Sequence, residues 1–291
     1  MIHNKNVNTI EKARIYGNNF LKGSSPTYLL DVEILLSYSI KKKKIFMYSD
    51  PQFLILPKHY KKFQRLLRLR KNKQPISYLV NSKEFYGRDF FVDKRVLIPR
   101  PETEGLIDIV KYQIAEKYFN NNKLKILDIG TGSGCIAITL LSELKNSLSI
   151  SAIDISAKAL TVAKKNCGLL SHGRINFFKV DIFKANLLTN KTFDIIVSNP
   201  PYLNLEDMSK LAKDIKDYEP KLALYGGKNG LDYYIVLEDF LQKHLSPNGF
   251  AVFEINNILS KKIAGVFSKK NTCKLIKDTN NLDRFILLFR H

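Results

Sequence analysis

The residues best suited to chemistry are four in a row, Asn199, Pro200, Pro201 and Tyr202. The side-chain oxygen of Asn199 and the backbone carbonyl of Pro200 can accept the hydrogens of a planar NH2 group, while the Tyr202 ring covers its flat face. An amide or aromatic amine is a poor nucleophile because its lone pair is delocalised. Such a clamp would therefore act by positioning and electrostatics, without a strong general base. The alternative is a tight turn with no other role, since Asn and Pro are common in turns.

The clamp must be positioned by the apolar run that precedes it, Ile195-Ile196-Val197. A short β-branched run is typical of a strand that is covered on both faces in a parallel sheet. The prolines end the strand because each lacks an N–H group and has a fixed φ, and they keep the preceding residue extended. We therefore expect Asn199 at the carboxyl end of a strand, where open α/β sheets bind ligands.

A glycine-rich loop follows another predicted strand, at residues 125–129, and comprises Gly130, Thr131, Gly132, Ser133 and Gly134. Its glycines permit unusual φ angles and let a ligand approach the backbone closely. The spacing G-x-G-x-G lacks the third glycine of the dinucleotide fingerprint. Asp128, two residues before the loop, is typical of S-adenosylmethionine binding. The loop therefore favours S-adenosyl-L-methionine over a dinucleotide as the cofactor.

Two further strands lead to carboxylates that could complete this cofactor site. The strand predicted at 149–153 leads to Asp154, 20 positions after Gly134, where a carboxylate can accept the hydroxyls of a ribose. The strand predicted at 175–180 leads to Asp181 and Ile182, which could bond the adenine amino group and pack on the adenine ring. Asp181 could instead cap a helix.

The periodicity of apolar residues divides the chain into three parts. Spacings of three and four over 1–74 predict a small all-helical domain, which we expect to bind substrate. The period changes over 75–98, where a hairpin linker is expected. Alternating strands and helices over 99–291 predict a doubly wound, Rossmann-like α/β domain. The linker contains three runs that predict short strands, at 77–80, 84–87 and 89–92.

The segment 97–104 predicts a stiff loop, because it contains two prolines. It carries a guanidinium, carboxylates and a hydroxyl, including those of Arg100, Glu102 and Thr103. Polar groups at this density on a rigid loop more often line a cleft than a plain surface. We therefore expect this loop to border the ligand site.

Composition narrows the classes of protein that this chain can be. Its 291 residues suggest about two domains, and its formal net charge of +20 invites an acidic or nucleic-acid partner. Lys far outnumbers Arg, however, a bias that AT-rich coding also produces. Cys135, Cys167 and Cys273 are widely scattered, which argues against a disulfide framework or a metal site. With no long apolar run and no signal peptide, we expect a cytoplasmic monomer without membrane contact.

Taken in order, the DIGTGSG loop, Asp154, Asp181 and NPPY resemble class I methyltransferases that modify planar nitrogens. Further segments narrow the resemblance to the peptide chain release factor N5-glutamine methyltransferases, and it covers nearly the whole chain. These segments are EFYG at 84–87, LIPRPETE at 97–104, YEP at 218–220, LAL at 222–224, GG at 226–227 and GLD at 230–232.

The resemblance implies methyl transfer from S-adenosyl-L-methionine to the side-chain nitrogen of the glutamine in the Gly-Gly-Gln motif of bacterial class I release factors, which modulates translation termination. Asn199 and Pro200 would accept the amide hydrogens, and Pro201 and Tyr202 would shape the slot. The cofactor would be held by Gly130, Thr131, Gly132, Ser133, Gly134, Asp154, Asp181, Ile182 and Asn199. Nucleic acid would not be required.

Two other functions fit part of this pattern, and the sequence departs from the pattern of the family at two positions. A DNA or RNA adenine-N6 amino methyltransferase would share NPPY and suit the basic charge, but no segment is left over for a target-recognition domain. A catalytically silent binding module would keep the fold alone. Asn81 and Asn256 stand where the family usually has Gly. An altered turn is expected at the first position and an altered last hairpin near the second.

Overall fold

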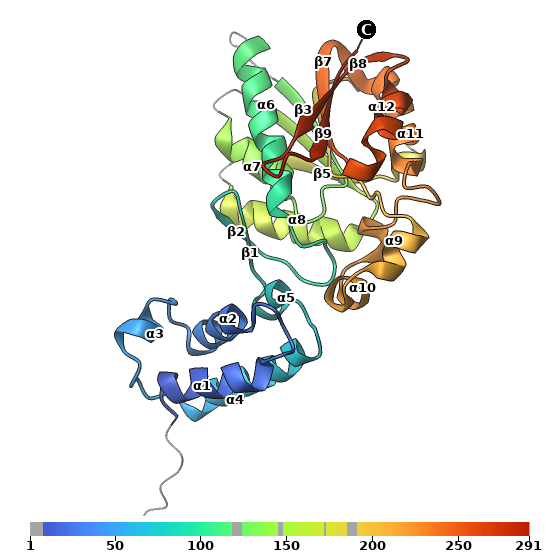
Figure 1. The fold of residues 1–291 in the computed structure, drawn as a ribbon. Coiled ribbons are helices and arrows are strands. Elements are labelled where there is room, and N and C mark those ends of the chain that lie inside the picture. The colour runs from blue at the N-terminus through green and yellow to red at the C-terminus, as the bar shows by residue number, and fades with distance from the viewer. Residues whose placement is uncertain (1–7, 118–123, 145–147, 172, 185–190, 291) are drawn as a thin grey trace, which may run out of the picture. The chain divides into compact units, whose positions relative to one another are not determined.

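The computed structural model describes residues 8–117, 124–144, 148–171, 173–184 and 191–290. The chain forms two compact units, which we call the helical unit and the sheet unit. The helical unit comprises Met1–Ser82 with Ala212–Tyr218, and the sheet unit comprises Lys83–Leu211 with Glu219–His291. The predicted fold class, a Rossmann-like domain with a small helical N-terminal domain, is confirmed (Figure 1).

The helical unit is built from short helices around one apolar core. Thr9 begins the first helix by accepting a hydrogen bond from Lys12 N at 3.2 Å, and Pro57 begins the fourth, where no N–H donor is needed. A buried ion pair of 2.7 Å between Arg70 Nε and Asp31 Oδ2 joins the second helix to the fourth. The helices are α1 (Ile10–Leu21), α2 (Tyr28–Ile40), α3 (Phe46–Ser49), α4 (Pro57–Lys71), α5 (Ile76–Val80) and α10 (Lys213–Tyr218).

The strand predicted at 77–80 is wrong, because this run is the helix α5. The carbonyl of Pro75 accepts the N–H groups of both Tyr78 and Leu79 at 3.1 Å, so the backbone is satisfied locally without a partner strand. The helix ends at Asn81, whose φ of 54° is left-handed. Asn adopts this conformation more readily than other residues with a side chain, so the turn forms without Gly.

Seven strands of the sheet unit form one sheet in the order β5-β4-β3-β6-β7-β9-β8. The first five are parallel, β9 pairs antiparallel with β7, and β8 pairs antiparallel with β9. The last hairpin, which Asn256 precedes, is formed, with an irregularity of register between Ile276 and Lys277. Asn256 has a φ of −76°, which needs no Gly, and β8 pairs with β9. The strands are β3 (Leu124–Ile129), β4 (Leu148–Asp154), β5 (Ile175–Lys179), β6 (Phe193–Ser198), β7 (Leu245–Glu254), β8 (Asn271–Lys277) and β9 (Asp283–Arg290).

Both faces of the sheet are buried, as the apolar run of β6 predicts. Ile195 and Val197 pack into one core cluster and Ile196 into the other. Helices α6 (Glu104–Lys117), α7 (Cys135–Glu143) and α8 (Ala157–Leu170) contribute to the first cluster, and α11 (Asp232–His244) and α12 (Ser260–Phe267) to the second (Figure 1). The core is therefore a three-layer sandwich of helices, sheet and helices. The remaining helix of this unit is α9 (Leu205–Lys210), and the short 3-10 turns are η1 (Pro101–Thr103), η2 (Ile182–Lys184), η4 (Lys221–Ala223) and η5 (Asn257–Leu259).

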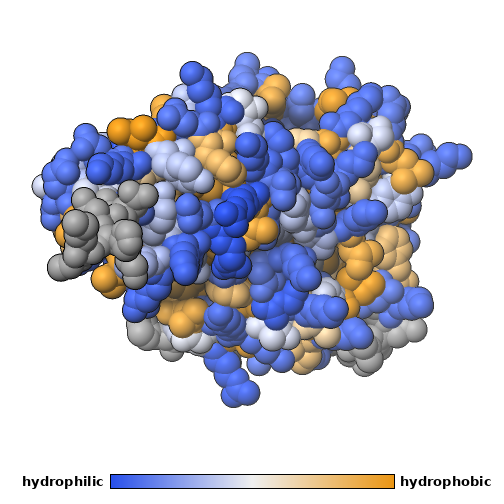
Figure 2. All heavy atoms as spheres, turned by 90° about the horizontal axis from the view of Figure 1, so that it is seen from below, coloured by the Kyte–Doolittle hydropathy of each residue, from blue (hydrophilic) through white to orange (hydrophobic). Residues whose placement is uncertain are grey.

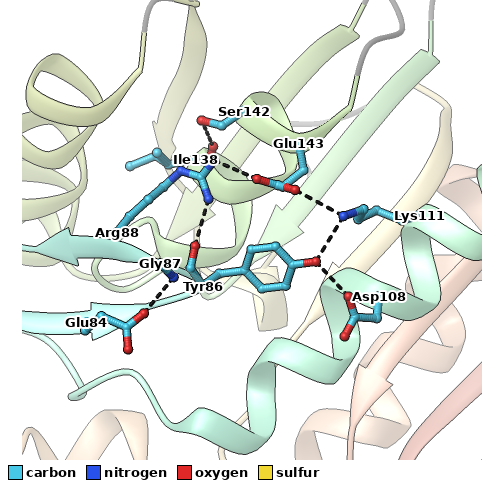
Figure 3. A network of polar contacts seen from close by, with 9 residues as sticks. All are labelled: Glu84, Tyr86, Gly87, Arg88, Asp108, Lys111, Ile138, Ser142 and Glu143. Carbon is cyan, nitrogen blue, oxygen red and sulfur yellow. Dashed lines mark hydrogen bonds and ion pairs between the residues drawn. The ribbon is translucent and has the colours of Figure 1, made fainter.

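The hairpin of β1 (Lys83–Phe85) and β2 (Arg88–Phe90) is fastened to the sheet unit by a polar network (Figure 3). Tyr86 and Gly87 form its two-residue turn with φ of 51° and 71°, as a type I′ turn requires. The Tyr86 hydroxyl donates to Asp108 Oδ1 at 2.7 Å and accepts from Lys111 at 3.0 Å. Glu143 accepts from both Lys111 and Arg88. These contacts offset the unfavourable left-handed conformation of Tyr86.

The surface is rich in polar groups. The face shown in Figure 2 is mostly hydrophilic, with hydrophobic residues in small separate groups. Part of the positive charge lies on α4, where Lys58, Lys61, Arg65 and Arg68 are exposed. Within the ranges that the structure describes, no helix combines the length and the apolar character needed to cross a bilayer.

Asn166 of α8 ties the chain after the hairpin to the glycine-rich loop. Its side chain is fully buried, accepts from Phe91 N at 2.8 Å and donates to Phe91 O at 2.9 Å and Ser133 O at 2.8 Å. The amide thereby pairs with the backbone of Phe91 as a neighbouring strand would, and it anchors the glycine-rich loop through Ser133 O.

Asn166→Ala should lower the free energy of unfolding by about 2–4 kcal/mol, because it leaves the partly buried N–H and carbonyl of Phe91 and the buried carbonyl of Ser133 without these partners. Urea denaturation measures the change. Asn176→Ala, at an exposed position of β5, is the matched control and should change stability by less than about 0.5 kcal/mol. Equal effects of the two substitutions would contradict this role of Asn166.

Candidate active site

Three parallel strands bring the predicted site residues to one edge of the sheet. β3 pairs with β4 and β6 so that Ile129 lies opposite both Ile153 and Ser198. The next residues along the three strands are Gly130, Asp154 and Asn199. Because these strands end in register, the glycine-rich loop, the carboxylate and the amide meet at the carboxyl edge.

A cavity of about 950 Å³, counted to its open mouth, lies at this edge. Of the predicted site residues, eight line it. Four others, Thr131, Ser133, Gly134 and Tyr202, do not line it. The lining ones are Gly130, Gly132, Asp154, Asp181, Ile182, Asn199, Pro200 and Pro201.

The glycine-rich loop is held in shape by its own backbone and by Asp154. Gly130 N and Thr131 N donate to Ile153 O at 2.9 and 3.0 Å. Asp154 accepts from Gly132 N at 3.0 Å and from Ser156 N at 2.8 Å. Burial raises the pKa of Asp154, while these two donors lower it. Each oxygen retains a second lone pair with which the carboxylate can bind a ligand in the cavity.

Asp128 lies at the end of β3, completely buried beneath the loop. Its Oδ2 accepts from the Thr131 hydroxyl at 2.6 Å. Removal from water, with a smaller effect of the nearby Asp154, raises the pKa of Asp128 to about 7, although the Thr131 hydrogen bond acts in the opposite direction. The floor of the site therefore holds a carboxyl group that can be charged or neutral near neutral pH.

Asp181 caps a short turn and lines the cavity at the same time. Its Oδ1 accepts from Phe183 N at 3.0 Å at the start of η2, as the capping alternative predicts. The neighbouring Ile182 is buried in the lining. Sequence reasoning missed Tyr233, whose ring packs edge-on against Phe183 with centroids 4.9 Å apart. This wall of the cavity is thus apolar and aromatic, with one carboxylate.

The loop 97–104 reaches the clamp through Thr103 alone among its predicted residues. The Thr103 hydroxyl accepts from Asn199 Nδ2 at 3.1 Å and donates to Glu254 Oε2 at 2.6 Å. Arg100 instead pairs at 2.7 Å with the buried Glu219, which also accepts from Ile98 N. Glu102 is exposed, and none of these three predicted loop residues lines the cavity. Leu97 is the residue of this loop that lines the cavity, next to Arg95 and Val96, which precede the loop.

Two glycines let a later segment lie directly on the backbone of the clamp. A Cβ on Gly226 would be 2.6 Å from both Pro201 O and Tyr202 Cα, and one on Gly230 would be 2.4 Å from Tyr202 O. Gly226 N also donates to Leu203 O at 2.8 Å. The glycine motif after NPPY therefore supports the clamp and does not contact the cavity.

Glu219 and Glu254 were missed as partners of predicted residues. The signal for Glu254 was present, because it is a carboxylate directly after the apolar run 250–253 at the end of β7, as Asp154 is at the end of β4. No signal linked Glu219 to Arg100, since the two lie 119 residues apart.

The cavity fits S-adenosyl-L-methionine. Gly130, whose φ is 72°, lines the cavity, and a Cβ on it would meet no atom within 4 Å, so its backbone borders open space. Asp154 and Asp181 can accept from ribose hydroxyls and an adenine amino group, and Ile182 and Phe183 offer an apolar surface to a flat ring. In the described part of the chain, no cluster of three His, Cys, Asp or Glu side chains could hold a metal ion.

Two known protein families match parts of this chain, and relatives match nearly all of it. The family described as methyltransferase small domain matches residues 105–223, and the PrmC N-terminal domain matches residues 12–80. The chain is 35% identical over 285 residues to a release factor glutamine methyltransferase of Clostridium acetobutylicum, covering 97% of this chain and 98% of that protein. A Bacillus subtilis protein of the same name is 35% identical over 266 residues, covering 89% of this chain and 90% of its own.

Among solved structures, the T. thermophilus 16S rRNA N2 G1207 methyltransferase, in complex with AdoMet and guanosine, superposes with a TM-score of 0.51. The match covers 72% of this chain and 50% of that chain at 14% identity, and it shows a shared fold.

Gly226→Ala should lower the free energy of unfolding by about 1–3 kcal/mol, because the added methyl group collides with backbone atoms of the clamp that cannot rotate away. The matched control is Gly265→Ala in α12, where a Cβ meets nothing within 4 Å. It should be neutral or stabilise by up to about 1 kcal/mol. Urea denaturation of the two variants compares them, and equal effects would refute the close approach.

Asp128→Asn should show a stability gain that grows with pH. A carboxyl whose pKa is raised from 3.8 to about 7 stabilises the fold below the lower value and loses that contribution as pH rises through the higher one. Asn does not titrate, so the difference in unfolding free energy, variant minus wild type, should increase between about pH 4 and about pH 7. Urea denaturation across this range measures it, and a constant difference would contradict the raised pKa.

Proposed function

The chain belongs to the release factor glutamine methyltransferase family, and we propose that it transfers a methyl group from S-adenosyl-L-methionine to the side-chain N5 of the glutamine in the Gly-Gly-Gln motif of bacterial class I release factors. It is a methyltransferase that uses S-adenosyl-L-methionine. The observation that carries the proposal is the position of Asn199 at the end of β6, in the wall of the cofactor cavity, with its Nδ2 already bonded to Thr103. This leaves Oδ1 available to a substrate amide.

The chemistry needs a nitrogen lone pair aimed at a methyl group. The bound cofactor supplies the electrophilic methyl group on its positive sulfur. Asn199 Oδ1 and the carbonyl of Pro200 accept the two amide hydrogens, which holds the nitrogen in place and draws its lone pair out of conjugation. Pro201 and Tyr202 shape the slot for the flat amide. With the cofactor bound, an N–C bond would form as the S–C bond breaks, which would leave the sulfur as a neutral thioether, and the nitrogen would give up one proton to solvent.

The cofactor is held by the residues at the carboxyl edge of the sheet. In this proposal Asp154 accepts the ribose hydroxyls, Asp181 accepts from the adenine amino group, and Ile182 packs on the adenine. The loop from Gly130 to Gly134 cradles the rest of the molecule, and Asn199 borders it. The cavity lining and the two carboxylates within it support these roles. Arg100, Glu102 and Thr103 belong to the loop that supports the cleft.

The helical part of the chain is proposed to bind the release factor. We assign this role to residues 1–74, a linker role to 75–98 and methyl transfer to 99–291. The exposed basic residues of α4 and the net charge of +20 suit an acidic protein surface. A cytoplasmic monomer that needs no nucleic acid completes the proposal.

The direct test is incubation with labelled S-adenosyl-L-methionine and an unmethylated release factor, followed by digestion and mass spectrometry. One methyl group on the glutamine of Gly-Gly-Gln is expected. A release factor with that glutamine replaced by alanine is the control and should stay unlabelled. Label in added nucleic acid, with none in the release factor, would favour an adenine-N6 amino methyltransferase instead.

Two substitutions should separate substrate from cofactor binding. Asn199→Ala removes the acceptor for the substrate amide at a residue that only borders the cofactor, so turnover should be lost while the dissociation constant for S-adenosyl-L-methionine changes little. Asp154→Ala should weaken cofactor binding by about 1.5–3 kcal/mol, the range for hydrogen bonds to a charged group. Isothermal titration calorimetry and the methylation assay measure the two effects. An equal loss of cofactor affinity in both variants would contradict the assigned roles.

A further inference from the structure

Three side chains from distant parts of the sequence form a hydrogen-bonded chain behind the clamp. Asn199 Nδ2 donates to Thr103 Oγ1 at 3.1 Å, and Thr103 Oγ1 donates to Glu254 Oε2 at 2.6 Å. The sheet register explains why they meet. β6 and β7 are parallel with Ser198 opposite Phe253, so the next residues, Asn199 and Glu254, leave the sheet side by side. Thr103, at the end of η1, places its hydroxyl between them.

We propose that Thr103 and Glu254 are positioning residues that fix the side-chain amide of Asn199 with its oxygen presented to the substrate. This inference rests on the proposed function, because it concerns how the clamp accepts the glutamine amide. Neither residue lines the cavity, so both act through Asn199 and not on the reacting atoms.

The number of hydrogens on the three side chains sets the direction of these hydrogen bonds. A Thr hydroxyl carries one hydrogen, and an ionised carboxylate carries none and can only accept. The short contact to Glu254 uses the hydroxyl hydrogen, so toward Asn199 the Thr103 oxygen can only accept. Asn199 must then turn its NH2 group to Thr103 and its oxygen away. With the amide reversed, two acceptors would face each other and a donor would meet the hydrogens of the substrate amide.

The burial of Glu254 supports a role beyond packing. Thr103 and Glu254 are each 2% exposed, and within the described residues no ion pair to the Glu254 side chain is seen. A buried carboxylate without an ion pair is costly, and such groups concentrate at functional sites. The fold also fixes its backbone, because the Tyr234 hydroxyl donates to Glu254 O at 3.0 Å and Glu254 lies opposite Phe285 of β9.

Protonation of Glu254 would reverse the donors and acceptors in these hydrogen bonds. A neutral carboxyl can donate to Thr103, whose hydrogen would then turn to Asn199 and occupy the oxygen that the substrate needs. Burial raises the pKa of Glu254 to about 7, against the opposing effect of the Thr103 hydrogen bond. Charged and titratable side chains on the neighbouring elements act on the same carboxyl. Arg284 and Arg100 lower its pKa and Glu102 raises it, while its charge raises the pKa of Tyr202. Methyl transfer should therefore slow on acidification through this range.

The first experiment compares Thr103→Val with Thr103→Ser in the full-length protein. Val keeps the shape of Thr but removes the hydroxyl, whereas Ser keeps the hydroxyl. With release factor and S-adenosyl-L-methionine both saturating at about pH 8.5, Thr103→Val should lower kcat about tenfold or more, as expected for a lost orienting hydrogen bond. Its dissociation constant for S-adenosyl-L-methionine should stay within about twofold of wild type, and Thr103→Ser should recover most of the rate. An unchanged kcat for Thr103→Val would overturn the proposal.

The second variant tests the proposal even if Thr103→Val folds poorly. Glu254→Gln can still accept from Thr103 but does not titrate. In the wild type, kcat should fall about tenfold between about pH 8.5 and about pH 6, as follows from a group with a pKa of about 7. In Glu254→Gln this fall should largely disappear. A variant that keeps the wild-type pH profile would overturn the role of Glu254.

The wild-type controls separate this proposal from the function on which it rests. A wild-type protein that binds S-adenosyl-L-methionine but transfers no methyl group to the release factor contradicts the proposed function. An active wild type with an equally active Thr103→Val variant contradicts the hydrogen-bonded chain alone.

Discussion

The site depends on the pairing of β6 with β3 on one side and β7 on the other. Because all three strands are parallel and end together, this register sets Gly130, Asn199 and Glu254 along one edge. A slip of one residue would exchange the two faces of β6 and turn Ile196 from one core cluster to the other. The buried apolar residues on both faces oppose such a slip. Hydrophobic packing thereby fixes the position of polar groups that it does not touch.

The same burial creates the unusual electrostatics of the site. Asp128 lies near the end of β3 and Glu254 at the end of β7, on either side of β6. Both side chains are buried away from water, and the pKa of each is raised to about 7. Each accepts a hydrogen bond from a threonine hydroxyl: Asp128 from Thr131, and Glu254 from Thr103. A single hydroxyl only partly replaces water around a carboxylate. The protein therefore keeps two proton-binding groups beneath its cofactor loop and its clamp.

Segments far apart in the sequence stiffen the clamp from outside. The glycines at 226 and 230 bring a later loop onto the backbone of Pro201 and Tyr202, and Glu219 binds the backbone and side chain of the loop that contains Arg100. Elsewhere in the sheet unit, Asn166 joins Phe91 to the glycine-rich loop. A substrate clamp that works by position needs such support, because small displacements of the acceptors reduce its effect.

The sequence by itself determined the strand–loop order of the Rossmann-like sheet, the buried strand before NPPY and the gathering of Asp154, Asp181 and Asn199 at one edge. These follow from local periodicity, from proline and glycine, and from the rule that parallel strands present their carboxyl ends together. It misjudged 77–80, since a short apolar run does not reveal whether a partner strand exists. Only the tertiary structure decided that Arg100 pairs with Glu219, that Thr103 joins Asn199 to Glu254 and that Gly226 touches the clamp. Each of these contacts joins residues whose separation along the chain carries no periodic signal, so only the packed fold brings them within reach.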